Sequence, residues 1–235
     1  MIMTKPISWS SLPHGEQALA TLSPYIAEQV TQVFGYHFLK LGALSSEVDT
    51  SKSSIAHQFS IVETGDATVN AAYTHLPLQK RSVDCVLSAL LLEFESNPYR
   101  VLREISRVLI SGGHLILIGC NPISPLSLGK VSPKHRQQCP WNGRFFTAHR
   151  VRDWLEVLGY QVIEQKKLVY HSLVGKFNDN SLLQQWMKNW LPFSGAFYVI
   201  TAKKVECPLT PSKASKKKRA TNWSTAPSAG RVNRS

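Results

Sequence analysis

The chain contains 235 residues, of which 43% are hydrophobic, and its formal net charge is +12. This length is enough for a domain that buries a sizeable core. No stretch approaches the roughly 18 uninterrupted apolar residues of a transmembrane helix, and the sequence does not open with the basic and apolar segments of a secretory signal. Because the four cysteines show no metal-ligand spacing, we expect a cytoplasmic protein with no metal site.

The N-terminal part of the sequence is expected to contain an extension, a helix and three strands. Residues 1–18 are polar and irregular, with Trp9 as a candidate anchor. Residues 19–34 have a helical pattern, in which Ser23 and Pro24 suit the N-cap and the first helical position. The strands that follow are predicted at residues 37–41, 55–62 and 68–72.

A strand, a helix and a second strand are predicted next. Residues 83–88 form a short, apolar, β-branched run, as expected of a strand that is buried on both faces of a parallel sheet. Asn97 suits an N-cap before Pro98, and apolar residues recur at helical spacing until the Gly112-Gly113 pair, which is expected to end the helix. With a strand at residues 114–119, this βαβ unit predicts a right-handed crossover in a doubly wound α/β sheet.

The C-terminal half of the sequence continues this alternation. Thr147 suits the N-cap of a helix that continues to Leu158, and Gly159 closes it. The remaining elements are predicted as a strand at 160–169, a short helix at 181–191 and a strand at 195–203. The chain is therefore expected to divide into an N-terminal extension (1–18), one domain (19–205) and a tail (206–235).

The tail carries much of the positive charge. It contains no acid after Cys207 and is rich in Pro, Ser, Thr, Lys and Arg, so it cannot bury enough apolar surface to fold alone. We expect a disordered basic arm whose generic capability is nonspecific contact with nucleic acid or anionic lipid. It supplies seven of the twelve net positive charges, through Lys213, Lys216, Lys217, Lys218, Arg219, Arg231 and Arg234.

The segment from residue 76 to residue 122 carries an ordered set of motif residues. They are Leu76, Pro77, Ser82, Asp84, Val86, Ser88, Glu93, Pro98, Leu102, Glu104, Ile105, Arg107, Val108, Leu109, Gly112, Gly113 and Leu115. In this order and spacing they resemble class I, S-adenosylmethionine-dependent methyltransferases of the type 11 family, in a divergent bacterial branch. The resemblance extends over roughly residues 30–205. It implies a Rossmann-like, seven-stranded, mostly parallel sheet, whose one antiparallel strand, the last, inserts between strands five and six.

The resemblance also implies S-adenosylmethionine as cofactor, bound at the carboxyl edge of the sheet, with the helix at 19–34 either over it or packed across the sheet edge. In the family a glycine-rich loop follows the first strand, because the backbone must approach the cofactor closely. An acid after the second strand accepts hydrogen bonds from the ribose hydroxyls. Glu63 is the nearby candidate, although it can equally be a solvated turn residue. The cofactor-facing residues implied in this way are Gly42, Ala43, Leu44, Glu63, His75, Leu76 and Ser88.

The sequence departs from the family pattern at three cofactor contacts. Leu44 and Ser45 stand where further glycines are expected. Lys40 stands near the position of the acid that usually ends the first strand, and Ala71 or Ala72 replaces an Asp that usually contacts adenine. We therefore expect a degenerate glycine loop.

Two loops at the same edge offer candidate substrate contacts. Glu93 and Glu95 are the carboxylates of the loop after the fourth strand, and either is a candidate general base. A solvated loop or helix start is the favoured interpretation, so no catalytic residue is assigned. The segment 126–146 resembles a substrate-side lid, whose basic residues Lys130 and Arg144 either attract an anion or are simply solvated.

These observations lead to two main hypotheses. The first is an S-adenosylmethionine-dependent methyltransferase whose acceptor is a small molecule, RNA or a protein. The second is a catalytically inactive, methyltransferase-like binding or regulatory protein, which the missing glycines favour. Nucleic-acid association through the basic tail is a third hypothesis, compatible with either.

Overall fold

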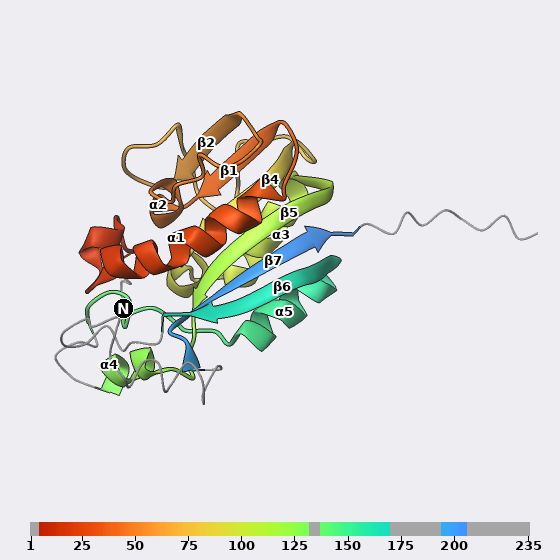
Figure 1. Ribbon diagram of the computed structural model, residues 1–235. Helices are drawn as coiled ribbons and strands as arrows, with labels where there is room; N and C mark the ends of the chain where they lie inside the picture. The colour runs from red at the N-terminus through yellow and green to blue at the C-terminus, as the bar shows by residue number, and fades with distance from the viewer. Residues whose placement is uncertain (1–4, 132–136, 170–193, 206–235) are drawn as a thin grey trace, which may run out of the picture.

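The computed structural model describes residues 5–131, 137–169 and 194–205, which form a twisted sheet with helices on both faces (Figure 1). Its strand order is β3-β2-β1-β4-β5-β7-β6, and β7 runs antiparallel to both of its neighbours. This confirms the predicted doubly wound sheet and the insertion of the last strand. The strands are β1 (His37–Leu41), β2 (His57–Val62), β3 (Val69–Asn70), β4 (Val83–Ala89), β5 (Leu109–Cys120), β6 (Tyr160–Leu168) and β7 (Phe197–Lys204).

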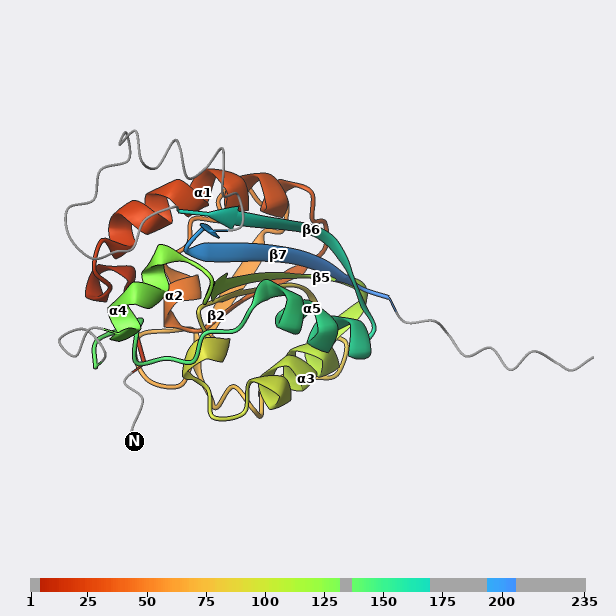
Figure 2. The same ribbon diagram turned by 90° about the horizontal axis from the view of Figure 1, so that it is seen from below.

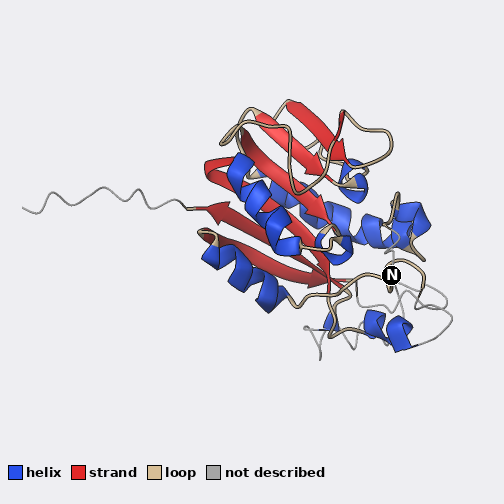
Figure 3. Cartoon of the chain, turned by 180° about the vertical axis from the view of Figure 1, so that it is seen from behind, coloured by secondary structure: helices blue, strands red, loops and turns tan. Residues whose placement is uncertain are grey.

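One long helix covers one face of the sheet, and two helices cover the other. α1 (Gly15–Thr31) crosses β4 and β5 on the near face in Figure 1. α3 (Pro98–Val108) and α5 (Ala148–Val157) lie on the opposite face, as the views from below and from behind show (Figures 2 and 3). None of the described helices is both long and apolar enough to cross a membrane. The short helical segments are η1 (Trp9–Ser11), α2 (Ala43–Ser46), η2 (Leu92–Phe94), η3 (Pro125–Ser127) and α4 (Leu128–Val131).

α1 begins earlier than the sequence pattern predicts. It starts at Gly15, so Pro24 lies inside the helix rather than at its first position. Ser23 is not the N-cap, because its hydroxyl donates to the carbonyl of Leu19 at 2.7 Å. An internal proline costs a helix about 3 kcal/mol, but the apolar stripe of α1 is buried on both sides of Pro24. That stripe consists of Ala18, Leu22, Ile26 and Val30.

α3 ends earlier than predicted. Its start is confirmed, since the Asn97 side chain accepts a hydrogen bond from the backbone N–H of Arg100 at 3.1 Å. The helix stops at Val108 and β5 begins at the next residue, so the Gly112-Gly113 pair lies inside the strand and not at the helix end. A Cβ at Gly113 would lie 2.9 Å from the carbonyl oxygen of Asp84. The glycine therefore permits the close approach of β5 to β4.

The other predicted elements differ mainly at their ends. β2 and β3 are shorter than the predicted 55–62 and 68–72. Thr147 is confirmed as the N-cap of α5, because its hydroxyl accepts from the N–H of Arg150 at 3.2 Å, and Gly159 follows the helix with a φ of 83°. The predicted helix at 181–191 and the basic tail at 206–235 lie outside the described residues.

Several residues of the family motif hold loops to the sheet. The Asp84 carboxylate accepts the backbone N–H groups of residues 36 and 37 at 2.9 and 2.8 Å. The Glu104 carboxylate accepts the N–H of Leu76 at 2.8 Å, while Arg107 donates to Glu104 and to the carbonyl of Leu76. These polar motif residues therefore have structural roles that are visible in the fold.

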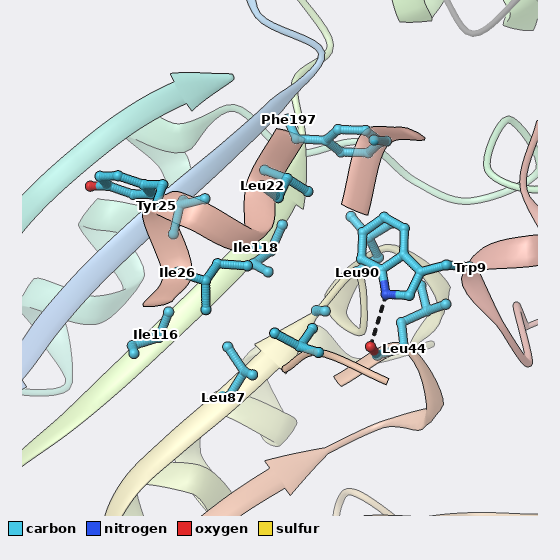
Figure 4. Close-up of a cluster of buried hydrophobic side chains, with 14 of the residues drawn as sticks. Trp9, Leu22, Tyr25, Ile26, Leu44, Leu87, Leu90, Ile116, Ile118 and Phe197 are labelled. Atoms are coloured by element: carbon cyan, nitrogen blue, oxygen red, sulfur yellow. Dashed lines mark hydrogen bonds between the residues drawn. The ribbon is translucent and has the colours of Figure 1, made fainter. Parts of the chain in front are cut away.

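The hydrophobic core consists of two clusters, one on each face of the sheet. In the cluster under α1, Leu22 and Ile26 lie over Leu87 of β4 and Ile118 of β5 (Figure 4). The other cluster packs the apolar sides of α3 and α5 against the opposite faces of the same strands. Each fully buried Leu or Ile side chain contributes about 1.5–3 kcal/mol relative to exposure, so both faces fix the position of the strand ends.

Candidate cofactor site

The turn after β1 has a backbone conformation that requires glycine. Gly42 has φ 95° and ψ 154°, a region that residues with a Cβ rarely adopt. Its N–H donates to the carbonyl of Ile61 at 2.9 Å. A Cβ at this position would lie 3.4 Å from Cδ1 of Leu91, on the opposite side of a small cavity. The remaining glycine of the degenerate loop is therefore the one that the turn needs.

The residue after Leu44, where a further glycine was expected, connects two strand ends. The Ser45 hydroxyl donates to the carbonyl of Leu41 at 2.6 Å and accepts the N–H of Ala89 at 2.8 Å. It thereby joins the carboxyl end of β1 to that of β4 within the core. This contact is a physical reason for a serine at this position.

The N-terminal segment packs against the same turn. The Trp9 side chain is fully buried, and its indole N–H donates to the carbonyl of Leu44 at 2.9 Å (Figure 4). Its ring meets Phe197 of β7 edge to face, with centroids 6.2 Å apart. The predicted role of Trp9 as an anchor is confirmed, and residues N-terminal to it are held near the strand ends.

A small cavity lies between this turn, the end of β4 and the N-terminal segment. Its volume is about 20 Å³, whereas sites for small organic ligands typically measure about 300–1,000 Å³. In this conformation the surrounding side chains therefore fill most of the space above the turn. The cavity is lined by Lys5, Pro6, Gly42, Ala43, Leu44, Tyr73, Ala89, Leu90, Leu91 and Phe94.

Lys5 links two carboxylates at this edge of the sheet. Its ammonium nitrogen lies 2.5 Å from Oε2 of Glu63, which follows β2, and 2.5 Å from Oε1 of Glu95, which follows η2. Burial opposes the charged form, but the two carboxylates prevail and raise the pKa of Lys5 above its usual value. The Lys5 and Glu63 side chains are about one-third exposed, whereas Glu95 is only 7% exposed. Lys5 thus neutralises a carboxylate that is nearly buried.

The structure brings four of the predicted cofactor-facing residues together. Gly42, Ala43 and Leu44 line the small cavity, and Glu63 reaches its edge through Lys5. Sequence reasoning missed Lys5 as the partner of Glu63 and Glu95, because 58 residues separate it from Glu63 and 90 residues from Glu95.

The other three predicted residues lie elsewhere. Leu76 is buried in the cluster beneath α3. Ser88 is fully buried, and its hydroxyl has no hydrogen-bond partner within the part of the chain that the structure describes. His75 is exposed and contacts Arg100 at a different cavity. Tyr73, two residues earlier, lines the small cavity instead, and its hydroxyl accepts the N–H of Glu63 at 3.2 Å.

The favoured interpretation of Glu93 and Glu95 as a solvated loop or helix start is wrong about the solvent, although Glu93 does lie in the short helix η2. As whole residues, Glu93 is 1% exposed and Glu95 is 5% exposed. One oxygen of Glu93 accepts the N–H of Cys120 at 2.8 Å, and the other has no hydrogen-bond partner among the described residues. Burial raises the pKa of Glu93 to about 7, although the N–H of Cys120, its own backbone N–H and the charge of Lys130 act in the opposite direction. The apolar run Leu90–Leu92 beside these acids was the signal that the loop is buried.

The basic residues of the expected lid make internal contacts. Lys130 donates to the carbonyl of Gly143 at 2.7 Å and lies over the ring of Phe145. Arg144 donates to the carbonyls of Glu95 and Ser96. Neither is simply solvated, and both hold loops at this edge of the sheet.

Comparison with known proteins identifies the domain. Residues 28–117 match the family described as "Methyltransferase domain". The uncharacterized protein YafS of Escherichia coli (strain K12) is 36% identical over 216 residues, which cover 91% of this chain and 88% of YafS. Malonyl-(acyl-carrier protein) O-methyltransferase 1 of Coxiella burnetii is 31% identical over 102 residues, 42% of this chain and 35% of that protein.

Solved structures share the fold at low sequence identity. A S-adenosylmethionine-dependent methyltransferase from Archaeoglobus fulgidus superposes with a TM-score of 0.57 at 17% identity, covering 80% of this chain and 94% of the other. The strand order, with an antiparallel β7 between β5 and β6, is typical of this fold. The chain therefore belongs to the same family as YafS and carries an S-adenosylmethionine-dependent methyltransferase domain of class I fold.

Proposed function

We propose that the chain binds S-adenosylmethionine over the Gly42 turn and transfers its methyl group to an acceptor. The conformation of Gly42 carries the proposal. A φ of 95° favours glycine, and because glycine has no Cβ, no side chain stands between the turn and a ligand above it. The turn lies at the carboxyl ends of β1 and β4, where ligands bind in open α/β sheets. When bound, the sulfonium cofactor supplies an activated methyl group, and the task of the protein is to align it with the acceptor.

The residues at this edge fit the cofactor in their chemistry. The Glu63 carboxylate follows β2 and can accept hydrogen bonds from both hydroxyls of a ribose. The side chains of Leu90, Leu91 and Phe94 give the cavity an apolar wall. No side chain is assigned as a general acid or base.

The space above the turn requires a rearrangement before the cofactor enters. With a cavity of about 20 Å³, Lys5 has to leave Glu63, and the Leu91 side chain has to move from Gly42. Lys5 is the more readily displaced of the two, because its ion pair with Glu63 is about one-third exposed on both sides and a surface ion pair contributes about 0.2–1 kcal/mol. Cofactor binding is therefore in competition with the Lys5–Glu63 contact.

Calorimetric titration with S-adenosylmethionine and S-adenosylhomocysteine tests the proposal. The wild-type chain is expected to bind both, and Lys5→Ala is expected to bind up to about fivefold more tightly, since the competing ion pair is gone. Glu63→Ala removes a charged hydrogen-bond acceptor and is expected to weaken binding about tenfold or more. Lys52→Ala, at an exposed lysine away from the cavity, is the matched control.

The same titration decides against the proposal if neither wild type nor Lys5→Ala binds at about millimolar ligand. The closed cavity would then favour the second hypothesis, a methyltransferase-like binding or regulatory protein without catalysis. The acceptor classes to be screened after positive binding are small molecules, RNA and proteins, and deletion of residues 206–235 tests the role of the basic tail in nucleic-acid contact.

A further inference from the structure

A second, larger cavity lies beside the cofactor site. Its volume is about 560 Å³, and it opens between the loop after β3 and the outer side of α3. The two cavities are neighbours along the chain, because Tyr73 lines the small one and Thr74 lines the large one. The large cavity is lined by Thr74, His75, Asn97, Tyr99, Arg100, Arg103, Glu104 and Arg107.

α3 contributes three arginines and a single carboxylate, Glu104, to the lining of this cavity. Positions 100, 103 and 107 follow helical spacing, which places them on one side of the helix. Glu104 is already saturated by partners: one oxygen accepts from Leu76 and Arg107 at 2.8 Å, and the other accepts from Arg107 at 3.0 Å. Although burial opposes ionisation, these donors hold the pKa of Glu104 below its usual value. Glu104 therefore neutralises Arg107 and leaves two arginine charges uncompensated.

The two remaining arginines differ in how they are held. Arg100 lies 2.8 Å from Nε2 of His75. Because a guanidinium group only donates, this nitrogen accepts in the contact, and Nδ1 of the same ring lies 3.2 Å from the Thr74 hydroxyl. His75 thus orients Arg100 without cancelling its charge. Among the described residues, no hydrogen-bond or ion-pair partner is found for Arg103, which is exposed.

We propose that this cavity binds a terminal phosphate group of a ligand through Arg100 and Arg103. The planar fork of a guanidinium matches phosphate oxygens, and two such groups balance the charge of about −1.5 to −2 of a phosphate monoester near neutral pH. Asn97 places the first turn of α3 in the same wall, where the positive end of the helix dipole adds to the attraction. The site is separate from the small cavity, and the proposal does not depend on methyl transfer.

The test is calorimetric titration of the full chain with inorganic phosphate and with adenosine 5′-monophosphate in chloride buffer. Both ligands are expected to bind at one site. Arg100→Gln and Arg103→Gln each remove a charged hydrogen bond and are expected to weaken binding about tenfold or more. Arg152→Gln is the matched control, since Arg152 is an exposed arginine of α5 that pairs with Glu156. Because Arg100 and Arg103 are exposed, their replacement leaves the hydrophobic core unchanged, and thermal unfolding of each variant checks this.

Two results would overturn the proposal. One is phosphate binding that is absent, or that falls equally in Arg152→Gln. The other comes from an RNA oligonucleotide that has no terminal phosphate and carries only diester groups. The proposal is overturned if the Arg100 and Arg103 variants lose as much affinity for this RNA as for the phosphate monoester. Equal losses would show that the cavity reads a nucleic-acid backbone and not a terminal phosphate.

Discussion

Replacing Glu93 by Gln should change how the stability of the protein depends on pH. The residue is 1% exposed, and one of its carboxyl oxygens has no hydrogen-bond partner in residues 5–131, 137–169 and 194–205. Burial raises its pKa from 4.5 to about 7. Between these two pH values the folded protein holds a proton that the unfolded chain has already released, so stability is fully present below about pH 4.5 and falls as the pH rises through about 7.

The size of the effect follows from the pKa difference. One pKa unit corresponds to about 1.4 kcal/mol, so the wild-type chain is expected to lose about 2–3 kcal/mol relative to Glu93→Gln between about pH 5 and about pH 8. Glutamine keeps an oxygen for the N–H of Cys120 but carries no charge at any pH. The contribution of every other titrating group cancels in this comparison.

Urea denaturation at a series of pH values measures the difference. Glu156→Gln serves as the control, because Glu156 is a half-exposed residue of α5 and its replacement should leave the pH dependence parallel to wild type. Parallel curves for wild type and Glu93→Gln would refute the reasoning, since they would mean that the Glu93 carboxylate is ionised in the folded protein at ordinary pH.

Two further substitutions test the turn and its anchor. Gly42→Ala forces a residue with a Cβ to φ 95° and points a methyl group toward Leu91, so a loss of about 1–3 kcal/mol in the free energy of unfolding and weaker cofactor binding are expected by denaturation and calorimetry. Trp9→Phe keeps an aromatic ring but leaves the buried carbonyl of Leu44 without its donor, and chemical denaturation should show a loss of about 1–3 kcal/mol. If the denaturation midpoint of either variant equals that of wild type, the stabilising role assigned to that residue is wrong.

The sequence predicts the sheet better than it predicts the helix ends. β1 and β4 are short apolar runs whose period and turn residues determine them locally, and the prediction of β1 agrees with the structure at both ends. α1 was misplaced because Pro24 suits a first helical position, while the burial that overrides this preference comes from residues on the distant sheet. The end of α3 was misplaced because Gly112-Gly113 has the composition of a helix stop, whereas both glycines lie inside β5 and Gly113 lets that strand approach β4.

The candidate site was predictable only where one local turn determines it. Gly42 and its two successors stand directly after β1, so the strand prediction also locates them. Lys5 and Glu95 meet across 90 residues, and no local pattern records such a contact. His75 was assigned to the cofactor because it follows β3, but the loop turns it toward α3 instead.

The position of β7 has a consequence for how the chain folds. β7 is made after β5 and β6 but lies between them, in register with both. During synthesis, the edges of β5 and β6 stay unpaired until residues 197–204 leave the ribosome, and an unpaired strand edge is a site for aggregation. Because these pairings are distant in sequence, they raise the contact order and slow folding. The last strand therefore completes the sheet. A chain that stops before β7 would expose the unpaired edges of β5 and β6 to chaperones and proteases.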